Sequence, residues 1–173
     1  MTGKILAALI LVVAIVAGGA MYYLQVYAFY DEVPEDEAQI SLTPMGSDAP
    51  EPLPFEGFEG IDAGSSPIRY RACFRTDLTL EEAAQSYKLY PDAVPRVAPG
   101  WFSCFDAEEI GQMIEDGRAD VFLSERNIEF GIDRVVAITE DGFGYVWHEI
   151  NECGDKSYDG TPLGEDCPAQ PAG

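Results

Sequence analysis

Basic side chains are scarce in this chain. Its 173 residues include 10 Lys and Arg against 31 Asp and Glu, so the net charge is -21 at pH 7. A polyanion of this kind is repelled by nucleic acid and by anionic lipid surfaces, so we expect the protein to bind neither of them through its acidic surface. A protein with a basic surface, or a metal cation, is the expected partner. Solubility alone also accounts for such a charge.

Histidine and the common catalytic motifs are scarce as well. His148 is the only histidine, and the chain has no Cys-x-x-Cys pair, no Gly-x-Ser-x-Gly elbow and no His-Glu-x-x-His motif. Zinc binding, thioredoxin-like chemistry and covalent haem attachment are therefore disfavoured. A hydrolase would need His148 as its base, although a histidine beside Trp147 on a strand is ordinarily packed. We expect no enzyme activity, with a hydrolase as the least favoured alternative.

One long apolar run is present. Residues 5–24 carry no charge, and at about 1.5 Å per residue a helix of this length crosses the roughly 30 Å core of a bilayer. Lys4 lies on the short side and only carboxylates follow on the other, which predicts a cytoplasmic segment 1–4 and an outward-facing remainder. The predicted transmembrane helix, 5–30, ends in an aromatic interfacial belt made of Tyr22, Tyr23, Tyr27 and Tyr30.

A cleaved secretory signal is the alternative for this run. Lys4, the apolar stretch 5–16 and the small residues before position 21 supply the usual three regions, with cleavage after Ala20. Cleavage there would leave an apolar, aromatic amino terminus on the mature protein, so we favour an uncleaved anchor. Both interpretations place the remainder in the same compartment.

Residues 31–66 are rich in acid and proline and contain no Lys or Arg. Such a segment buries too little apolar surface to offset its ordering entropy, so we predict an extended, self-repelling tether. Phe55 and Phe58 lie in a repeated tripeptide within it. They are expected to pack on the protein's own domain or, as a sharper hypothesis, to dock on a partner.

Residues 67–173 are predicted to form one α+β domain. Alternation over 68–75 predicts a half-buried strand, and residues 101–105 predict a short one. Strands are also expected at 119–124, 132–139 and 143–150.

Two helices are predicted in the same domain. Thr79 with Glu82 has capping-box spacing, and Asp106 with Glu109 repeats the signal, with Gly117 as a stop. We expect a largely antiparallel sheet with the helices on one face.

Four cysteines in an exported domain predict disulfide bonds. Three pairings are possible, and we prefer Cys73 with Cys104 and Cys153 with Cys167. Each closed loop contributes on the order of 3 kcal/mol through the unfolded state. A zinc site is the competing interpretation, but its usual ligand spacing is absent.

The segment 155–166 resembles a calcium loop of the EF-hand type. Two features depart from that pattern: position 12 is Asp instead of Glu, and Pro162 replaces a β-branched residue. No helix is expected on either flank, so an acidic turn closed by a disulfide is the favoured interpretation. The ligands of the calcium hypothesis are Asp155, Ser157, Asp159, the carbonyl of Thr161, and Asp166.

Four arginines on predicted strands suggest an anion site, because guanidinium groups bind carboxylate and phosphate in a fork geometry. Ion pairs with acids such as Asp133, Glu129 or Glu149 are the favoured alternative. The four residues are Arg69, Arg71, Arg75 and Arg134.

Four stretches resemble an uncharacterised family of short single-pass bacterial envelope proteins: YRACF (70–74), WFSCF (101–105), GIDRVVA (131–137) and WHEINEC (147–153). The resemblance implies an inner-membrane, outward-facing topology and brings no assigned activity or site.

From these observations we expect a membrane-anchored periplasmic binding or scaffolding module. It would act by contact with another envelope protein, as an accessory subunit or assembly factor of an inner-membrane complex. A calcium- or anion-responsive sensor domain is the alternative. Apart from possible calcium, no cofactor is expected.

Overall fold

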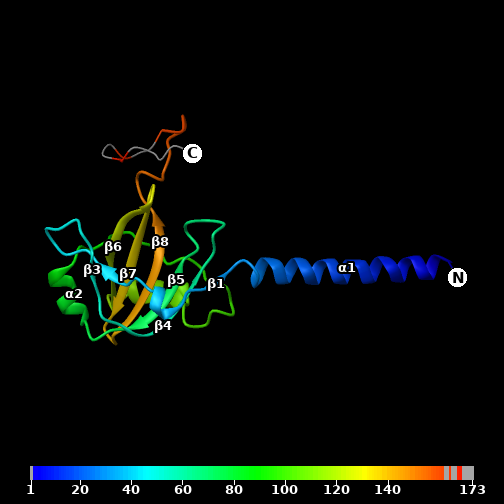
Figure 1. The fold of residues 1–173 in the computed structure, drawn as a ribbon, viewed down its shortest axis with the longest axis horizontal. Coiled ribbons are helices and arrows are strands. Elements are labelled where there is room, and N and C mark those ends of the chain that lie inside the picture. Colours follow the sequence, from blue (N-terminus) through cyan, green and yellow to red (C-terminus); the bar gives the residue numbers. More distant parts are fainter. Residues whose placement is uncertain (1, 162–163, 165–166, 169–173) are drawn as a thin grey trace. The chain divides into compact units, whose positions relative to one another are not determined.

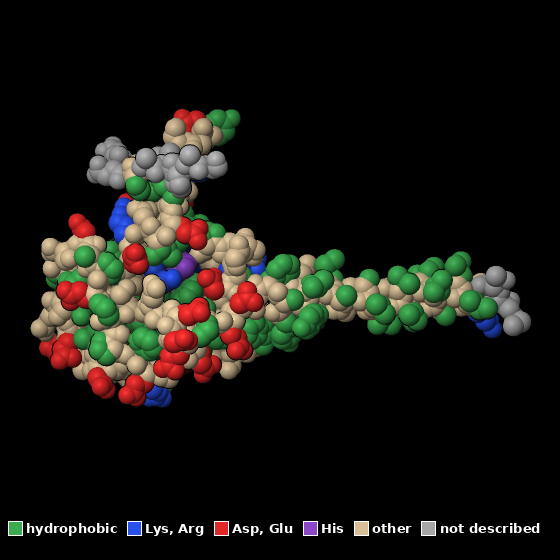
Figure 2. Space-filling model, in the orientation of Figure 1, with side chains coloured by type: hydrophobic (Ala, Val, Ile, Leu, Met, Phe, Trp, Pro, Cys, Tyr) green, Lys and Arg blue, Asp and Glu red, His purple; other side chains and the backbone are tan. Residues whose placement is uncertain are grey.

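The structure, a computed structural model, describes residues 2–161, 164 and 167–168 and divides into two units, 1–31 and 32–173. In the first unit a single helix, α1 (Thr2–Val26), is apolar along its length (Figures 1 and 2). At 1.5 Å per residue it is about 37 Å long. Within residues 3–26, an 18-residue window has a mean hydropathy of 2.6, so the helix is long and apolar enough to span a membrane.

The second unit contains a six-stranded sheet in the order β1-β4-β5-β8-β7-β6 and a two-stranded antiparallel sheet, β2-β3 (Figure 1). The neighbouring pairs β4-β5, β5-β8, β8-β7 and β7-β6 are all antiparallel. The strands are β1 (Asp31–Glu32), β2 (Ser41–Leu42), β3 (Glu51–Pro52), β4 (Glu56–Asp62), β5 (Arg71–Arg75), β6 (Ala119–Glu129), β7 (Ile132–Thr139) and β8 (Phe143–Ile150). The short helices are η1 (Glu35–Glu37), α2 (Leu80–Ser86) and α3 (Ala107–Glu115). The α+β prediction is confirmed.

Both α-helices of this unit begin where their caps predict. The Thr79 side chain accepts from the Glu82 backbone N–H while the Glu82 carboxylate accepts from that of Thr79, and Asp106 caps α3. Gly117 adopts a φ of +72° after α3, and Gly142 a φ of +77° in the turn between β7 and β8. Predicted strands 132–139 and 143–150 match β7 and β8.

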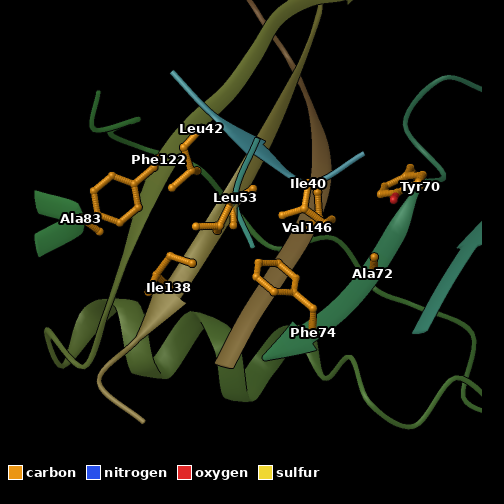
Figure 3. Packing of buried hydrophobic residues seen from close by; sticks show 11 residues of the cluster. Ile40, Leu42, Leu53, Tyr70, Ala72, Phe74, Ala83, Phe122, Ile138 and Val146 are labelled. Carbon is orange, nitrogen blue, oxygen red and sulfur yellow. The ribbon is translucent and has the colours of Figure 1, made fainter. Parts of the chain in front are cut away.

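One face of the sheet carries the main apolar core. Phe74, Val136 and Val146 point from the central strands toward this face, which α2 covers through Ala83. Figure 3 shows Ile40 beside Val146 in this cluster.

The prediction of an extended tether over residues 31–66 was wrong, because residues 32–66 belong to the folded unit. Ile40, Leu42 and Leu53 are buried in the core (Figure 3), and Ile61 of β4 is buried as well. The prediction was wrong because widely spaced apolar residues between the prolines cover a sheet face that other segments leave open. A charge count over the segment does not detect this.

The opposite face of the sheet is also covered. Arg71 and Cys73 of β5 are buried there, as are Trp147 of β8 and Ile110 of α3. β5 is therefore buried on both faces, not on one as predicted, and α2 and α3 lie on opposite faces.

Residues 101–105 form no strand in the structure, against the prediction. The disulfide between Cys104 and Cys73 holds this segment on the face that α3 covers, with Cα atoms 6.2 Å apart. The second disulfide joins Cys153 and Cys167. Both preferred pairings are present.

Candidate interaction surface

Among the described residues of the folded unit, the most exposed large aliphatic side chains lie on a loop without regular secondary structure. This proline loop (residues 91–100) contains three prolines and precedes the segment held by Cys104. Val94 is 66% exposed and Val97 is 81% exposed. An exposed valine is common on protein surfaces by itself, so the loop becomes informative only through the way in which it is held.

Arg71 holds the loop from β5. Its side chain is 4% exposed, and its guanidinium donates to the carbonyl oxygen of Arg96 at 2.8 Å and to that of Val97 at 3.4 Å. It also donates to the carbonyls of Ile68 and Tyr70 at 2.9 Å and 2.6 Å. A fixed fork of N–H donors can satisfy several carbonyls that have no strand or helix partner. Arg71 therefore fixes the backbone just beneath Val97.

Glu149 holds the same loop from β8. Its side chain is 9% exposed, and the carboxylate accepts from the Val94 backbone N–H at 2.9 Å and from the Trp147 indole N–H at 2.8 Å. Arg96 of the loop donates to its other oxygen at 2.8 Å. The carboxylate thus fixes the backbone beneath Val94.

Burying a carboxylate or a guanidinium is expensive unless hydrogen bonds and an opposite charge compensate it. Here both buried charges contact the loop backbone on the inside, while Val94 and Val97 lie outside. The loop is consequently fixed in position while its aliphatic side chains remain in water. This arrangement suits a preorganised contact surface, which loses little entropy on binding.

A second buried carboxylate adjoins Glu149 in the sheet. Asp133 pairs with it across β7 and β8 and accepts from the Asn127 backbone at 2.8 Å and the Asn151 amide at 2.6 Å. Arg126 Nη1 lies 3.8 Å from Asp133 Oδ2, and the same guanidinium also pairs with Glu152. Burial raises the pKa of Tyr90 well above its usual value, and the negative charge of Asp133 is the next largest cause. This cluster closes the end of the sheet, and the Asp133 Oδ2 atom in it is buried without a hydrogen bond from the described residues.

The four arginines of the predicted anion site do not converge. Arg71 is occupied by carbonyls, and Arg75 stacks on Phe143 with its guanidinium carbon 4.1 Å from the ring centre. Arg134 lies on the opposite face, 4.6 Å above the Tyr70 ring. Arg69 also has an interaction partner.

His148 is engaged at both ring nitrogens. Arg134 Nε donates to its Nε2 at 3.1 Å, so Nδ1 carries the proton and donates to the Pro67 carbonyl at 2.5 Å. The ring stacks on Tyr70, with centres 5.0 Å apart. Burial lowers the pKa of His148 to about 4, and the neighbouring Arg134 and Arg71 add to this effect.

Phe55 and Phe58 pack on the protein's own domain. Their rings lie 5.8 Å apart, and Phe55 contacts Phe74 edge-on at 6.2 Å. Both remain partly exposed. The structure therefore has the two rings packed on the protein's own domain, and docking on a partner stays a prediction.

In the predicted calcium loop, the described oxygen atoms bond to each other. Asp159 Oδ1 accepts from the Ser157 hydroxyl and from the backbone and hydroxyl of Thr161, which lowers the pKa of Asp159 to about 2. The Thr161 carbonyl accepts from the Ser157 N–H. Asp166 lies outside the described residues. Within those residues, no three His, Cys, Asp or Glu side chains converge on a position that suits a metal ion.

The sequence did not reveal the proline loop as a surface or the role of Arg96. One usable signal existed: Trp147 and Glu149 alternate on β8, so an indole donor and a carboxylate share a face. A carboxylate beside a buried indole on a central strand indicates that another segment must pair with it. The sequence does not say which segment does so.

A family model described as a family of unknown function (DUF6446) matches residues 40–168. The chain belongs to this family. No curated protein and no solved structure matches it. The expected resemblance to an uncharacterised family is thereby confirmed, and the match includes most of the segment that was predicted as a tether.

Proposed function

We propose that the protein is a membrane-anchored binding module that captures another envelope protein through the proline loop. The observation that carries this proposal is the fixation of an exposed Val94 and Val97 by the buried charges Arg71 and Glu149. Buried charges are costly, and here they fix a loop whose two valines remain exposed. A non-catalytic role fits the occupied ring of His148.

The proposed topology is single-pass in a bacterial inner membrane, with the folded unit in the periplasm. Its support is the apolar helix α1, the single Lys4 before it and the carboxylates after it. The two disulfides favour an oxidising compartment.

The proposed partner has an apolar contact patch inside a basic rim. Figure 2 shows carboxylates spread over the visible face of the folded unit, with few basic side chains among them. Interfaces commonly combine an apolar centre with a polar rim, and opposite charges on the two rims accelerate association. Salt should therefore slow this association.

Photocrosslinking in intact cells tests the proposal. A photoreactive amino acid replaces Val97 in the full chain, and crosslinked products are identified by mass spectrometry. We expect one predominant protein product that carries a basic surface, with a yield that falls as ionic strength rises in isolated membranes.

The matched control places the same amino acid at Gln85, an exposed position on α2. It should give no such product. Equal products from positions 85 and 97, or none from 97, would contradict a docking role for the loop.

A further inference from the structure

A hollow of about 300 Å³ lies at the β1-β4 edge of the sheet. Its walls combine three aromatic side chains, Phe58, Trp101 and Phe102, with two exposed carboxylates, Glu32 and Glu59. No Lys or Arg lines it. Aromatic faces and carboxylates share one chemical preference, which is for a cation.

The aromatic wall is held in place by the fold. Phe102 is buried and meets Trp101 edge-on, with ring centres 6.3 Å apart. The nearby disulfide at Cys104 fixes this segment on β5. On the other side, the Phe58 ring lies over Gly60, where any side chain would collide with it.

The charges around the hollow are uncompensated. The helix η1 lies next to β4 and adds three exposed carboxylates, Glu35, Asp36 and Glu37. Among the described residues, no ion pair involves these three groups or Glu32 and Glu59. A cation entering the hollow therefore meets carboxylates that form no ion pair among the described residues.

We propose that this hollow binds an alkylammonium group, the side chain of a lysine on the partner protein. The methylene stem would lie against Phe58 and Trp101, with the ammonium between Glu32 and Glu59. Aliphatic stems pack on apolar surface while their charged ends stay near water or carboxylates. The inference rests on the proposed binding function and names the chemistry of one partner contact.

The test uses the full chain in detergent micelles, labelled with 5-fluorotryptophan. The chain has two tryptophans, Trp101 in the hollow and Trp147, which is fully buried and serves as an internal reference. Titration with N-acetyl-lysine methylamide should shift the Trp101 fluorine signal saturably and leave that of Trp147 in place. N-acetyl-norleucine methylamide, which lacks the ammonium, should shift neither signal.

Two variants assign the site. Glu59→Gln should weaken binding of the lysine probe about three- to tenfold, because half of the carboxylate pair is lost. Glu81→Gln, at an exposed position on α2, should leave binding unchanged. A non-saturating shift, an equal shift with the norleucine probe, or unchanged binding to Glu59→Gln would overturn the proposal.

A lipid headgroup is the other source of an alkylammonium group. Phosphoethanolamine should bind at least tenfold more weakly than the lysine probe, because the acidic edge repels its phosphate. Equal or tighter binding would overturn the assignment to lysine. The outcome of this test is distinguishable from that of the proposed function. If position 97 gives crosslinks but the lysine probe does not bind, docking through the proline loop is supported and lysine binding in the hollow is ruled out.

Discussion

The two faces of the sheet are covered in different ways. On the face with α2, the covering segments meet the sheet through apolar side chains such as Ile40, Leu42 and Leu53. On the face with α3, the proline loop meets it through the charged side chains Arg71 and Glu149. The first face is an ordinary hydrophobic core, whereas the second combines apolar side chains such as Trp147 and Ile110 with directional bonds from buried charges.

The difference follows from what the covering backbone needs. Residues 40–53 partly satisfy their own backbone groups, through β2-β3 and a bond from the Leu53 N–H to the Ile40 carbonyl. The proline loop lacks three N–H donors and has no strand partner, so the carbonyls of Arg96 and Val97 and the Val94 N–H bond to side chains instead. Buried charges on a central strand therefore mark the place where an irregular segment crosses a sheet.

The largest expected effect is on the face with α3. Glu149→Ala leaves the Trp147 indole, the Val94 N–H and Arg96 without their acceptor. The free energy of unfolding should fall by about 3–5 kcal/mol. Urea denaturation of the full chain in detergent, followed by near-ultraviolet circular dichroism, measures it.

Glu152→Ala is the matched control. It also removes a carboxylate paired with an arginine, but that carboxylate is half-exposed, so the loss should stay below about 1 kcal/mol. Equal losses for the two variants would show that burial of Glu149 has no special role.

The next effect tests the face with α2. Leu42 is fully buried, so Leu42→Ala should lower the free energy of unfolding by about 3 kcal/mol through lost burial and a cavity. Leu89, which is 53% exposed, supplies the same substitution as a control, with an expected loss below about 0.5 kcal/mol. If Leu42→Ala were also neutral, residues 32–66 would behave as the tether that the sequence predicts.

Acid should lower the free energy of unfolding through His148, whose side chain lies on the face with α2. Burial holds its pKa at about 4, whereas the unfolded chain has the usual value of 6.5. Between these values only the unfolded chain takes up the proton, so stability is complete above pH 6.5 and falls as the pH drops. The loss from pH 7 to pH 5 should be about 2 kcal/mol.

Comparison with His148→Gln isolates this contribution, because nearby carboxylates titrate equally in both proteins. The difference in unfolding free energy between the two should shrink as the pH falls to 5. A constant difference would mean that the histidine does not change its proton uptake on folding.

Local signals predicted much of the fold. Capping at Thr79 and Asp106, and the strands 132–139 and 143–150, depend on neighbours in sequence and were found correctly. The burial of residues 40–53 was missed, and the strand predicted at 101–105 is absent, because the structure of both segments depends on distant parts of the sheet. For the same reason, the candidate surface was not predicted. The sequence suggested an anion or, preferably, an internal carboxylate as the partner of Arg71, but its acceptors include the carbonyls of Arg96 and Val97.

The smallest expected effect on stability is the most informative about function. Val97 points into water, so Val97→Ser should change the free energy of unfolding by less than about 0.5 kcal/mol. In a chain carrying the photoreactive amino acid at position 94, the same substitution should lower crosslinking about fivefold, because it removes an apolar contact at the centre of the interface. A surface valine without a partner would leave both measurements unchanged. A valine that supports the fold would lower stability and crosslinking together, so a loss of crosslinking alone separates a docking residue from a structural one.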